Sequence, residues 1–275
     1  MPTIEQNKNF WDEIYPWSKG GDEWSVHWGG SNLKWWVTVF PRIQRFVPTD
    51  TILEIAPGFG RWTQYLKDLC NHLIIVDLSE KCIQACKERF SNYSHISYHV
   101  NDGKSLDIIP DHSIDFVFSF DSLVHVEDDV LEAYLSQLGH KFKPGGVGFM
   151  HHSNRGEDKV YISLLSMIPM GIRAYLMKKR ILDRGHGRAL SVTAKKFQEF
   201  ADKAGMQCIS QEIMSWWSRR MIDCFSVFTP KGSVWTRPNK IIRNNDFVKE
   251  ANYALRLAEV YHGADLHQKI KIISS

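Results

Sequence analysis

The chain lacks the features that mark several large protein classes. Its 275 residues include five cysteines, an odd number, and no C-x-x-C pair. The sequence therefore predicts neither a disulfide framework nor a zinc site. The formal net charge is only +3, which disfavours a nucleic-acid partner, since dedicated binders carry a strong basic stripe. Residues 1–10 are polar, so we expect no secretory signal.

A long, uninterrupted apolar run is also missing. The most apolar stretch, residues 160–177, contains Pro169, Gly171 and Arg173, which disfavour a helix buried in a bilayer. With 43% hydrophobic residues, the chain has enough apolar side chains for one large core. We therefore expect a soluble, cytoplasmic protein without stable membrane insertion, whose cysteines are small side chains in a reducing compartment.

The most informative feature that is present is a strand–loop–helix pattern around two glycines. Residues 52–55 predict a buried strand, Gly58 and Gly60 predict a tight loop, and a helix is expected to follow. A second apolar strand, residues 73–76, ends at Asp77. An acid at that position can accept hydrogen bonds from the ribose hydroxyls of a nucleoside cofactor.

Two details bear on the cofactor class. A dinucleotide fingerprint, G-x-G-x-x-G, needs a third glycine where this chain has Thr63. Glu54 lies inside the strand before the loop and suits a ligand with positive charge. Residues 54–60 resemble the first motif, E/D-x-G-x-G-x-G, of the class I S-adenosylmethionine (SAM) methyltransferases, with Ala56 replacing the first glycine. A dinucleotide-binding or non-catalytic Rossmann-like domain is the alternative.

Three later segments resemble the same family in the family's order: residues 100–103, 113–121 and 142–146. The resemblance implies an α/β, Rossmann-like fold with a mostly parallel seven-stranded sheet and helices on both faces. It also implies an enzyme with SAM as methyl donor and S-adenosylhomocysteine as product. The predicted cofactor-binding residues are Glu54, Ala56, Gly58, Gly60, Trp62, Asp77, Leu78, Asp102, Gly103, Phe120 and Trp28.

The residue patterns divide the chain into five predicted segments. Residues 1–48 hold six of the ten tryptophans, and the resemblance implies that they form a lid over the cofactor. Residues 49–154 are expected to be the SAM-binding core, because strands alternate there with helices. Residues 155–190 are predicted to be an inserted helical cap, residues 191–230 a helix and an antiparallel hairpin that end the core, and residues 231–275 a helical tail.

Candidate catalytic residues lie where two predicted strands end, since such folds bind ligands beyond the carboxyl ends of parallel strands. Asp121 and His125 follow the fourth strand, and His151 and His152 end the fifth. We predict His125 and His152 as candidate bases and Asp121 as an orienting acid. Because strand residues alternate, at most one of His151 and His152 should reach the acceptor. A divalent metal is not expected, since no tight ligand spacing demands one.

The methyl acceptor is the least specified part. The chain resembles small-molecule methyltransferases found beside bacterial polysaccharide and sugar-modification enzymes, which implies methylation of a hydroxyl on a saccharide or sugar nucleotide. Trp216 and Trp217 could face a sugar ring, and basic residues near 178–188 and 219–220 could bind an anionic acceptor. The alternatives are N-methylation of a small amine, a lipid or quinone methyltransferase, and a SAM-binding protein without turnover. The oligomeric state stays open.

Overall fold

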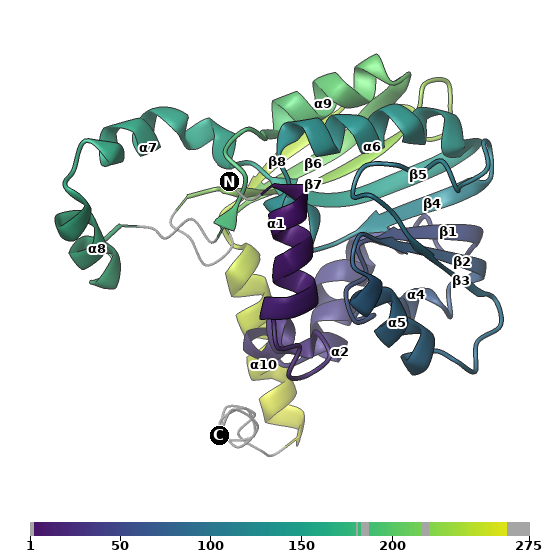
Figure 1. Cartoon of the computed structure of the whole chain (residues 1–275), viewed down its shortest axis with the longest axis horizontal. Helices are drawn as coiled ribbons and strands as arrows, with labels where there is room; N and C mark the ends of the chain where they lie inside the picture. The colour runs from purple at the N-terminus through teal and green to yellow at the C-terminus, as the bar shows by residue number, and fades with distance from the viewer. Residues whose placement is uncertain (1–2, 180, 183–186, 216–219, 263–275) are drawn as a thin grey trace. The chain divides into compact units, whose positions relative to one another are not determined.

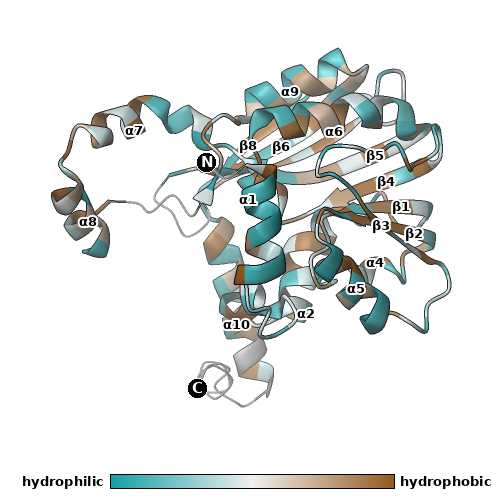
Figure 2. Cartoon of the chain, in the orientation of Figure 1, coloured by the Kyte–Doolittle hydropathy of each residue, from teal (hydrophilic) through white to brown (hydrophobic). Residues whose placement is uncertain are grey.

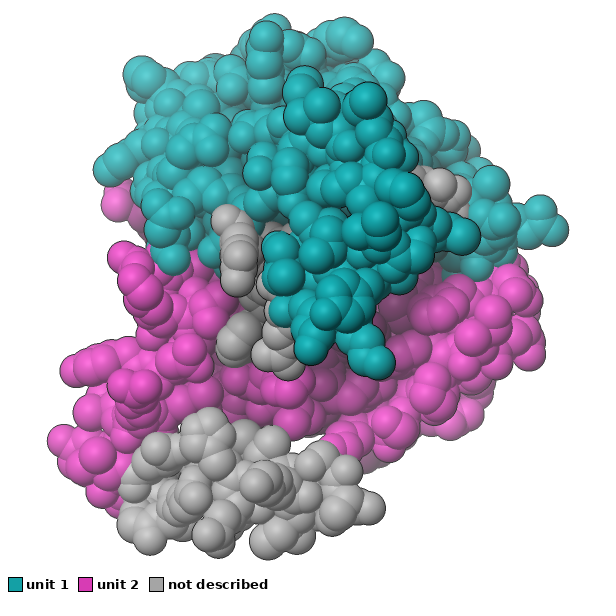
Figure 3. Space-filling view, turned by 90° about the vertical axis from the view of Figure 1, so that its left-hand side faces the viewer, with its two compact units in different colours: residues 1–7, 101–245 teal, residues 8–100, 246–275 magenta. Residues whose placement is uncertain are grey.

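The computed structural model describes residues 3–179, 181–182, 187–215 and 220–262 (Figure 1). The chain divides into two compact units, which Figure 3 shows in different colours. We call residues 8–100 and 246–275 the glycine-loop unit, and residues 1–7 and 101–245 the histidine unit.

The strands of the glycine-loop unit are β1 (Thr49–Ile55), β2 (Cys70–Asp77) and β3 (Ile96–Val100). β2 pairs in parallel with β1 on one side and with β3 on the other. The last five residues of β1 are all buried, as expected for a parallel strand covered on both faces. Helices α4 (Thr63–Leu66) and α5 (Glu80–Arg89) connect the strands. This is the βαβ pattern that the sequence predicted.

Short helices and one longer helix complete this unit. They are η1 (Phe10–Ile14), η2 (Asp22–Trp28), α2 (Ser31–Lys34), η3 (Trp35–Val39), α3 (Phe40–Ile43) and α10 (Phe247–His262). Aromatic rings pack the N-terminal segment on α4 and on the glycine loop. Trp35 stacks on Tyr65 of α4 with 4.8 Å between ring centroids, and Trp17 stacks on Phe59 of the loop at 4.4 Å. The aromatic-rich segment therefore packs on the loop within this unit, and its action as a lid stays a prediction.

The histidine unit contains β4 (Ile114–Ser119), β5 (Phe142–Ser153), β6 (Met206–Met214), β7 (Asp223–Pro230) and β8 (Lys240–Asn244). β4 pairs in parallel with β5, and β7 lies antiparallel between β5 and β6. β8 pairs in parallel with β6. Helices α6 (Asp128–Lys141) and α9 (Ala194–Lys203) pack on each other (Figure 1).

The described residues hold eight strands, one more than the seven predicted. The additional strand is β8, which falls in the segment predicted as a helical tail. Its sequence, Lys-Ile-Ile-Arg-Asn, does not alternate between apolar and polar residues, because most of the strand is exposed on both faces. No strand could therefore be predicted from this segment. The predicted Rossmann-like α/β fold, a mixed sheet with helices on both faces, is confirmed.

The remaining helices of the histidine unit lie at its connections. They are η4 (Leu123–His125), η5 (Arg155–Asp158), α7 (Lys159–Ser166) and α8 (Met170–Lys178), and α1 (Ile4–Asn9) spans the boundary between the two units in the sequence. The helical cap predicted for residues 155–190 is interrupted at Pro169, which is the N-cap of α8. Among the described residues, no helix combines the length and apolar character that a membrane span requires.

Candidate functional site

The glycine loop follows β1 and adopts a backbone that most residues avoid. Gly58 has φ +59° and Gly60 has φ +80°, values that glycine adopts without steric cost. Ala56 also has a positive φ, +58°, although it carries a Cβ. The residue that replaces the first glycine of the family motif therefore takes up the left-handed conformation that favours glycine, at a local cost.

Asp77, the last residue of β2, is held against this loop by backbone groups. Its Oδ2 accepts a hydrogen bond from the Gly58 N–H at 3.1 Å, and its Oδ1 accepts one from the Ser79 N–H at 2.9 Å. Burial raises the pKa of Asp77 to about 6. Each carboxylate oxygen has a second lone pair, so Asp77 can still accept hydrogen bonds from ribose hydroxyls.

Glu54 lies in β1 and is buried beside the same loop. The Thr63 hydroxyl donates a hydrogen bond to its Oε2 at 2.6 Å. Burial raises the pKa of Glu54 to about 8, so the carboxyl is mostly neutral at about pH 7. A cationic ligand nearby would favour the ionised form, which fits the amino acid end and the sulfonium of SAM.

The other residues predicted to bind the cofactor in this unit have different surroundings. Leu78 directly follows Asp77 and is half-buried. Trp62 is buried and lies 6.0 Å from the ring of Trp35. Trp28 is buried against Phe247, with ring centroids 5.5 Å apart, and lies under the ammonium of Lys34. These contacts favour a packing role for Trp28, and its contact with the cofactor stays a prediction.

Trp17 is a residue at the loop that the sequence did not single out. A Cβ added at Gly58 would lie 2.8 Å from the Trp17 ring. The only signal in the sequence was the tryptophan-rich composition of residues 1–48, which does not distinguish one ring from another.

Asp102 and Gly103, also predicted to bind the cofactor, form a turn after β3 along the chain. The backbone N–H groups of Ser105 and Lys104 donate to Oδ1 of Asp102 and hold the pKa of that carboxyl below its ordinary value. Gly103 has φ +85°. Phe120 is buried, and its ring centroid lies 5.1 Å from that of His151.

A buried charge network surrounds His151 in the histidine unit. Its Nδ1 accepts a hydrogen bond from the Asp121 N–H at 3.2 Å, and its Nε2 lies 3.2 Å from Oδ1 of Asp223. The Arg188 Nε donates to the same Asp223 oxygen at 2.8 Å. Burial opposes ionisation of Asp223, but Arg188 and His151 hold its pKa below the ordinary value. Asp223 is therefore ionised in the core.

Asp121 connects this network to the strand ends where acceptors bind in such folds. It follows β4 and has φ +67°, a strained conformation for a residue with a Cβ. Its Oδ1 lies 3.3 Å from Nδ1 of His151, and 16% of its side chain is exposed. Strained backbone at a strand end is a feature of functional sites. The structure thus brings predicted Asp121 together with His151, Asp223 and Arg188.

His152 lies in a different environment, as strand alternation predicted. It is fully buried and stacks on Phe197, with centroids 4.3 Å apart. Its Nε2 lies 2.8 Å from the Ser226 hydroxyl. Burial lowers the pKa of His152 to about 3. These contacts favour packing, and a catalytic role for His152 stays a prediction.

His125, in η4, is half-buried and contacts a neighbouring loop. Its Nδ1 lies 3.0 Å from the carbonyl oxygen of Gly187. A carbonyl only accepts, so Nδ1 carries the hydrogen and Nε2 carries the lone pair of the neutral ring. Burial lowers the pKa of His125, which keeps the ring neutral and able to accept a proton.

Asp223 and Arg188 are functional candidates that the sequence did not identify. Arg188 belonged to a basic cluster that could bind an anion or form a solvated face, and Asp223 carried no signal beyond its place at the start of a strand. Pairing of Ser153 with Asp223 across β5 and β7 brings the latter to His151.

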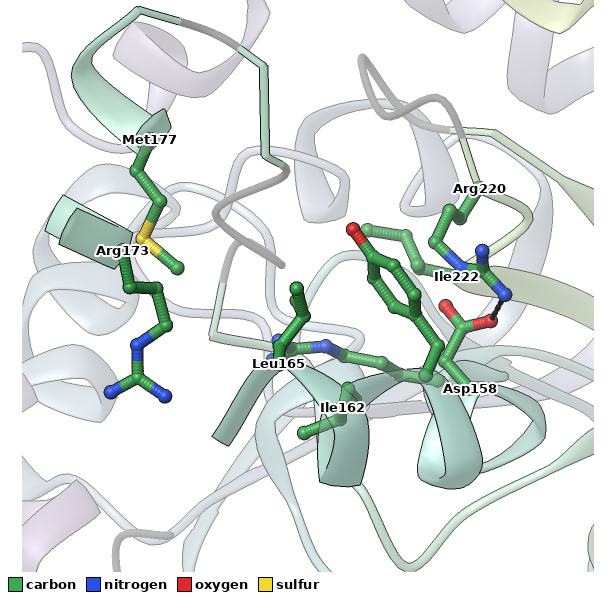
Figure 4. A pocket seen from close by; sticks show the side chains of 9 residues that line it. Asp158, Ile162, Leu165, Arg173, Met177, Arg220 and Ile222 are labelled. Carbon is green, nitrogen blue, oxygen red and sulfur yellow. Dashed lines mark ion pairs between the residues drawn. The ribbon is translucent and has the colours of Figure 1, made fainter. Parts of the chain in front are cut away.

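An arginine-lined cavity of about 70 Å³ lies elsewhere in the histidine unit (Figure 4). Asp158 pairs with Arg220 at 2.5 Å, and the Arg220 guanidinium lies 4.2 Å from the centroid of the Tyr161 ring. The lining of the cavity thus includes three arginines, of which Arg220 is paired with Asp158, and an apolar wall. Its lining residues are Arg155, Asp158, Tyr161, Ile162, Leu165, Arg173, Met177, Arg220 and Ile222.

Several residues of the predicted acceptor site lie outside the described residues: Trp216, Trp217, Arg219, and Arg180 and Arg184 of the basic cluster near 178–188. Within the described ranges, no group of three or more His, Cys, Asp or Glu side chains is placed to hold a metal ion.

Residues 52–146 match the family model described as "Methyltransferase domain". The chain carries a class I SAM-dependent methyltransferase domain. The match begins in β1 and runs through the glycine loop, Asp77, Asp102 and Asp121. The predicted family and SAM as its cofactor are confirmed, in preference to a dinucleotide.

Solved structures agree with this methyltransferase fold. A Pyrococcus horikoshii protein superimposes with a TM-score of 0.54 at 19% identity, covering 79% of this chain and 97% of that one. A SAM-dependent methyltransferase of Methanosarcina mazei gives 0.53 at 15% identity, covering 70% and 98%. At these identities the likeness shows the fold alone.

The curated relatives of the methyltransferase domain are longer proteins. Phosphoethanolamine N-methyltransferase 1 of Triticum aestivum is 30% identical over 118 residues, which are 41% of this chain and 24% of the relative. Phosphoethanolamine N-methyltransferase 2 of Caenorhabditis elegans is 25% identical over 206 residues, 74% of this chain and 42% of the relative. The chain thus spans less than half the length of these relatives.

Proposed function

We propose that this protein transfers the methyl group of SAM to a hydroxyl oxygen of a small anionic acceptor. The observation that carries the proposal is the contact of Asp121 with His151, itself held by Asp223 and Arg188. A hydroxyl is a poor nucleophile until its proton leaves, so O-methylation requires a base of this kind.

In this proposal the glycine-loop unit binds the donor. Bound SAM supplies an electrophilic methyl group on a cationic sulfonium. Asp77 accepts hydrogen bonds from ribose hydroxyls, and Glu54 ionises to balance the positive charge. Correct alignment of two bound reactants can contribute roughly 7–11 kcal/mol, so the rigid backbone of Gly58 and Gly60 serves catalysis by fixing the donor.

The histidine unit accepts the proton that the acceptor hydroxyl loses. The Asp121 carboxylate accepts the hydroxyl proton as the oxygen attacks the methyl group, and the proton can then pass from Oδ1 of Asp121 to Nδ1 of His151 over 3.3 Å. The imidazolium formed is stabilised by ionised Asp223, whose Oδ1 lies 3.2 Å from Nε2. His125, with its lone pair on Nε2, is the second candidate base.

The arginine-lined cavity supports an anionic acceptor. Three arginines line this one cavity, Arg155, Arg173 and Arg220, and guanidinium binds phosphate and carboxylate in a bidentate geometry. A sugar nucleotide joins hydroxyls to phosphates, so we propose this class, within polysaccharide biosynthesis, as the acceptor. The five free thiols fit the reducing cytoplasm as the place of the reaction.

A second candidate is N-methylation of a small amine that bears a phosphate. It is favoured by the names of the curated relatives, which are phosphoethanolamine N-methyltransferases. The arginine-lined cavity would serve such a phosphate equally well. An ammonium must also lose a proton before it attacks, but water can remove it, so a strong base is less necessary.

The test is a transfer assay with SAM labelled on its methyl group. The acceptors are a panel of sugar nucleotides, the same sugars without phosphate, and phosphoethanolamine, with products identified by mass spectrometry. We expect methylated sugar nucleotide. Transfer to phosphoethanolamine alone would establish the second candidate. Binding of SAM in calorimetry without transfer to any acceptor would instead indicate a SAM-binding protein without turnover.

A further inference from the structure

Helices α7 and α8 of the histidine unit expose an unusual amount of apolar surface. Neither helix contains a fully buried residue, and Figure 2 shows hydrophobic positions along both. In a helix of a folded domain, one apolar face is normally buried against a neighbour. Six large apolar side chains here are more than half exposed: Val160, Leu164, Met167, Met170, Ile172 and Tyr175.

The arginine-lined cavity does not account for these six residues. The side chains that line it from α7 and α8 are Tyr161, Ile162, Leu165, Arg173 and Met177 (Figure 4). The six exposed residues are absent from that lining, so they are apolar surface outside the cavity. We call these six residues the outer face.

The charged residues within the segment 159–179, which carries the outer face, have one sign. Residues 159–179 contain Lys159, Arg173, Lys178 and Lys179 and no acidic residue, although the whole chain has a net charge of only +3. A second copy of this chain would bring like charges together at this surface, which disfavours self-association. The charges instead complement an anionic partner.

We propose that the outer face binds the surface of an anionic lipid membrane. Exposed apolar side chains with only lysine and arginine around them are the pattern of helices that lie in the plane of a bilayer interface. The apolar side chains enter the boundary between headgroups and acyl chains, and the ammonium groups contact anionic headgroups. Both helices are too short to span a bilayer, so the binding is reversible and peripheral.

The experiment is co-sedimentation of the whole protein with vesicles, without SAM or acceptor. One set of vesicles is phosphatidylcholine alone, and the other contains phosphatidylglycerol as well. We expect binding at least about tenfold stronger to the anionic vesicles, and weaker binding as salt screens the lysines. No binding to anionic vesicles would overturn the proposal.

Two variants test whether the outer face is responsible. Met167→Glu with Met170→Glu adds negative charge to the outer face and should abolish vesicle binding. Val234→Glu changes an equally exposed apolar residue outside these helices and should leave binding unchanged. Circular dichroism checks that all variants fold. Retained binding in the methionine variant contradicts the proposal, as does a dimer in ultracentrifugation that this variant dissociates.

A second pair of variants tests how much the lysine charges contribute to vesicle binding. Lys178→Glu with Lys179→Glu should reduce binding to anionic vesicles at least about tenfold. Lys195→Glu with Lys203→Glu, on α9, makes the same change in net charge elsewhere and should have a smaller effect. Equal losses in the two pairs would mean that net charge, not the outer face, drives binding. Because these measurements involve no methyl transfer, they are independent of the proposed function.

Discussion

The backbone N–H of Asp121 donates a hydrogen bond to Nδ1 of His151 at 3.2 Å. Nδ1 therefore carries the lone pair of the neutral ring, and Nε2 carries the hydrogen that it donates to Asp223. The left-handed backbone at Asp121 also places its carboxylate 3.3 Å from the same Nδ1. One residue thus sets the tautomer of the histidine and offers it a route for a proton.

Removing either partner of this contact should slow methyl transfer. We expect Asp121→Asn and His151→Gln each to lower kcat by roughly 10²–10⁴-fold, the usual contribution of a general base, and to leave the affinity for SAM unchanged. Steady-state kinetics and calorimetry measure the two effects. His140→Gln, an exposed histidine on α6, is the matched control. A kcat unchanged in both variants would rule out the proton route.

His152→Phe should affect stability and not catalysis. The ring can still stack on Phe197, but the Ser226 hydroxyl loses its contact with Nε2, which costs roughly 1–3 kcal/mol. We expect urea denaturation to show this loss while kcat per folded molecule is kept. A collapse of kcat in a stable variant would instead assign catalysis to His152.

His152 should also make the free energy of unfolding depend on pH in the acidic range. Its folded pKa of about 3 lies below the ordinary value of 6.5. Between these values the unfolded chain binds a proton at His152 that the folded state excludes. The contribution of His152 to the free energy of unfolding is therefore lost as the pH falls from 6.5 toward 3. In His152→Phe this part of the pH dependence should be absent.

Glu54 should have the opposite effect at higher pH. Its folded pKa of about 8 lies above the ordinary value of 4.5. In this window the folded state holds a proton that the unfolded chain has lost, so its contribution to the free energy of unfolding falls as the pH rises. The slope is about 1.4 kcal/mol per pH unit. Because Asp77 and His152 also titrate, the measured quantity is the difference between wild type and Glu54→Gln across pH.

Binding of SAM should release the proton of Glu54. The cationic ligand favours the ionised carboxylate, so we expect up to about one proton released per cofactor at about pH 7. Calorimetry in two buffers with different ionisation enthalpies measures the number. Glu54→Gln should release markedly fewer protons, and equal release in wild type and variant would show that Glu54 does not respond to the ligand.

Gly58→Ala should weaken SAM binding by more than about tenfold. The new Cβ would lie 2.8 Å from the Trp17 ring and would be held at a φ of +59°, a conformation that costs roughly 1–2 kcal/mol. Gly171→Ala, in α8, is the matched control, because a Cβ added there would meet no atom within 4 Å outside its own helix. It should leave SAM affinity unchanged. Ala56→Gly should relieve local strain and keep SAM affinity.

Arg173→Gln should raise the KM for an anionic acceptor and leave kcat unchanged, because the guanidinium binds a group remote from the reacting atom. The loss of one charge-assisted contact corresponds to roughly tenfold in KM. Lys195→Gln, an exposed cation on α9, is the control. Equal KM values for Arg173→Gln and wild type would show that Arg173 does not bind the anionic group of the acceptor.

The glycine loop with Asp77 beside it could be predicted because its determinants are local. Gly58, Gly60 and Asp77 belong to one strand–loop–helix–strand unit, and the spacing along the chain already determines that Asp77 lies beside the loop. Backbone conformation and strand order within a βαβ unit leave few alternatives. The same local reasoning assigned His151 and His152 to opposite faces of β5.

The residues proposed for catalysis could be brought together only by the tertiary structure. Asp223 reaches His151 only because β7 runs antiparallel to β5, a pairing between residues 72 positions apart in the chain. Arg188 joins from a loop whose basic residues gave no indication of Asp223 as a partner. Such contacts depend on which strands pair and in which register, and neither choice is encoded in a short window of sequence. The sequence by itself therefore determined the family, the fold and the donor, whereas only the folded chain decided which histidine has acids on both sides.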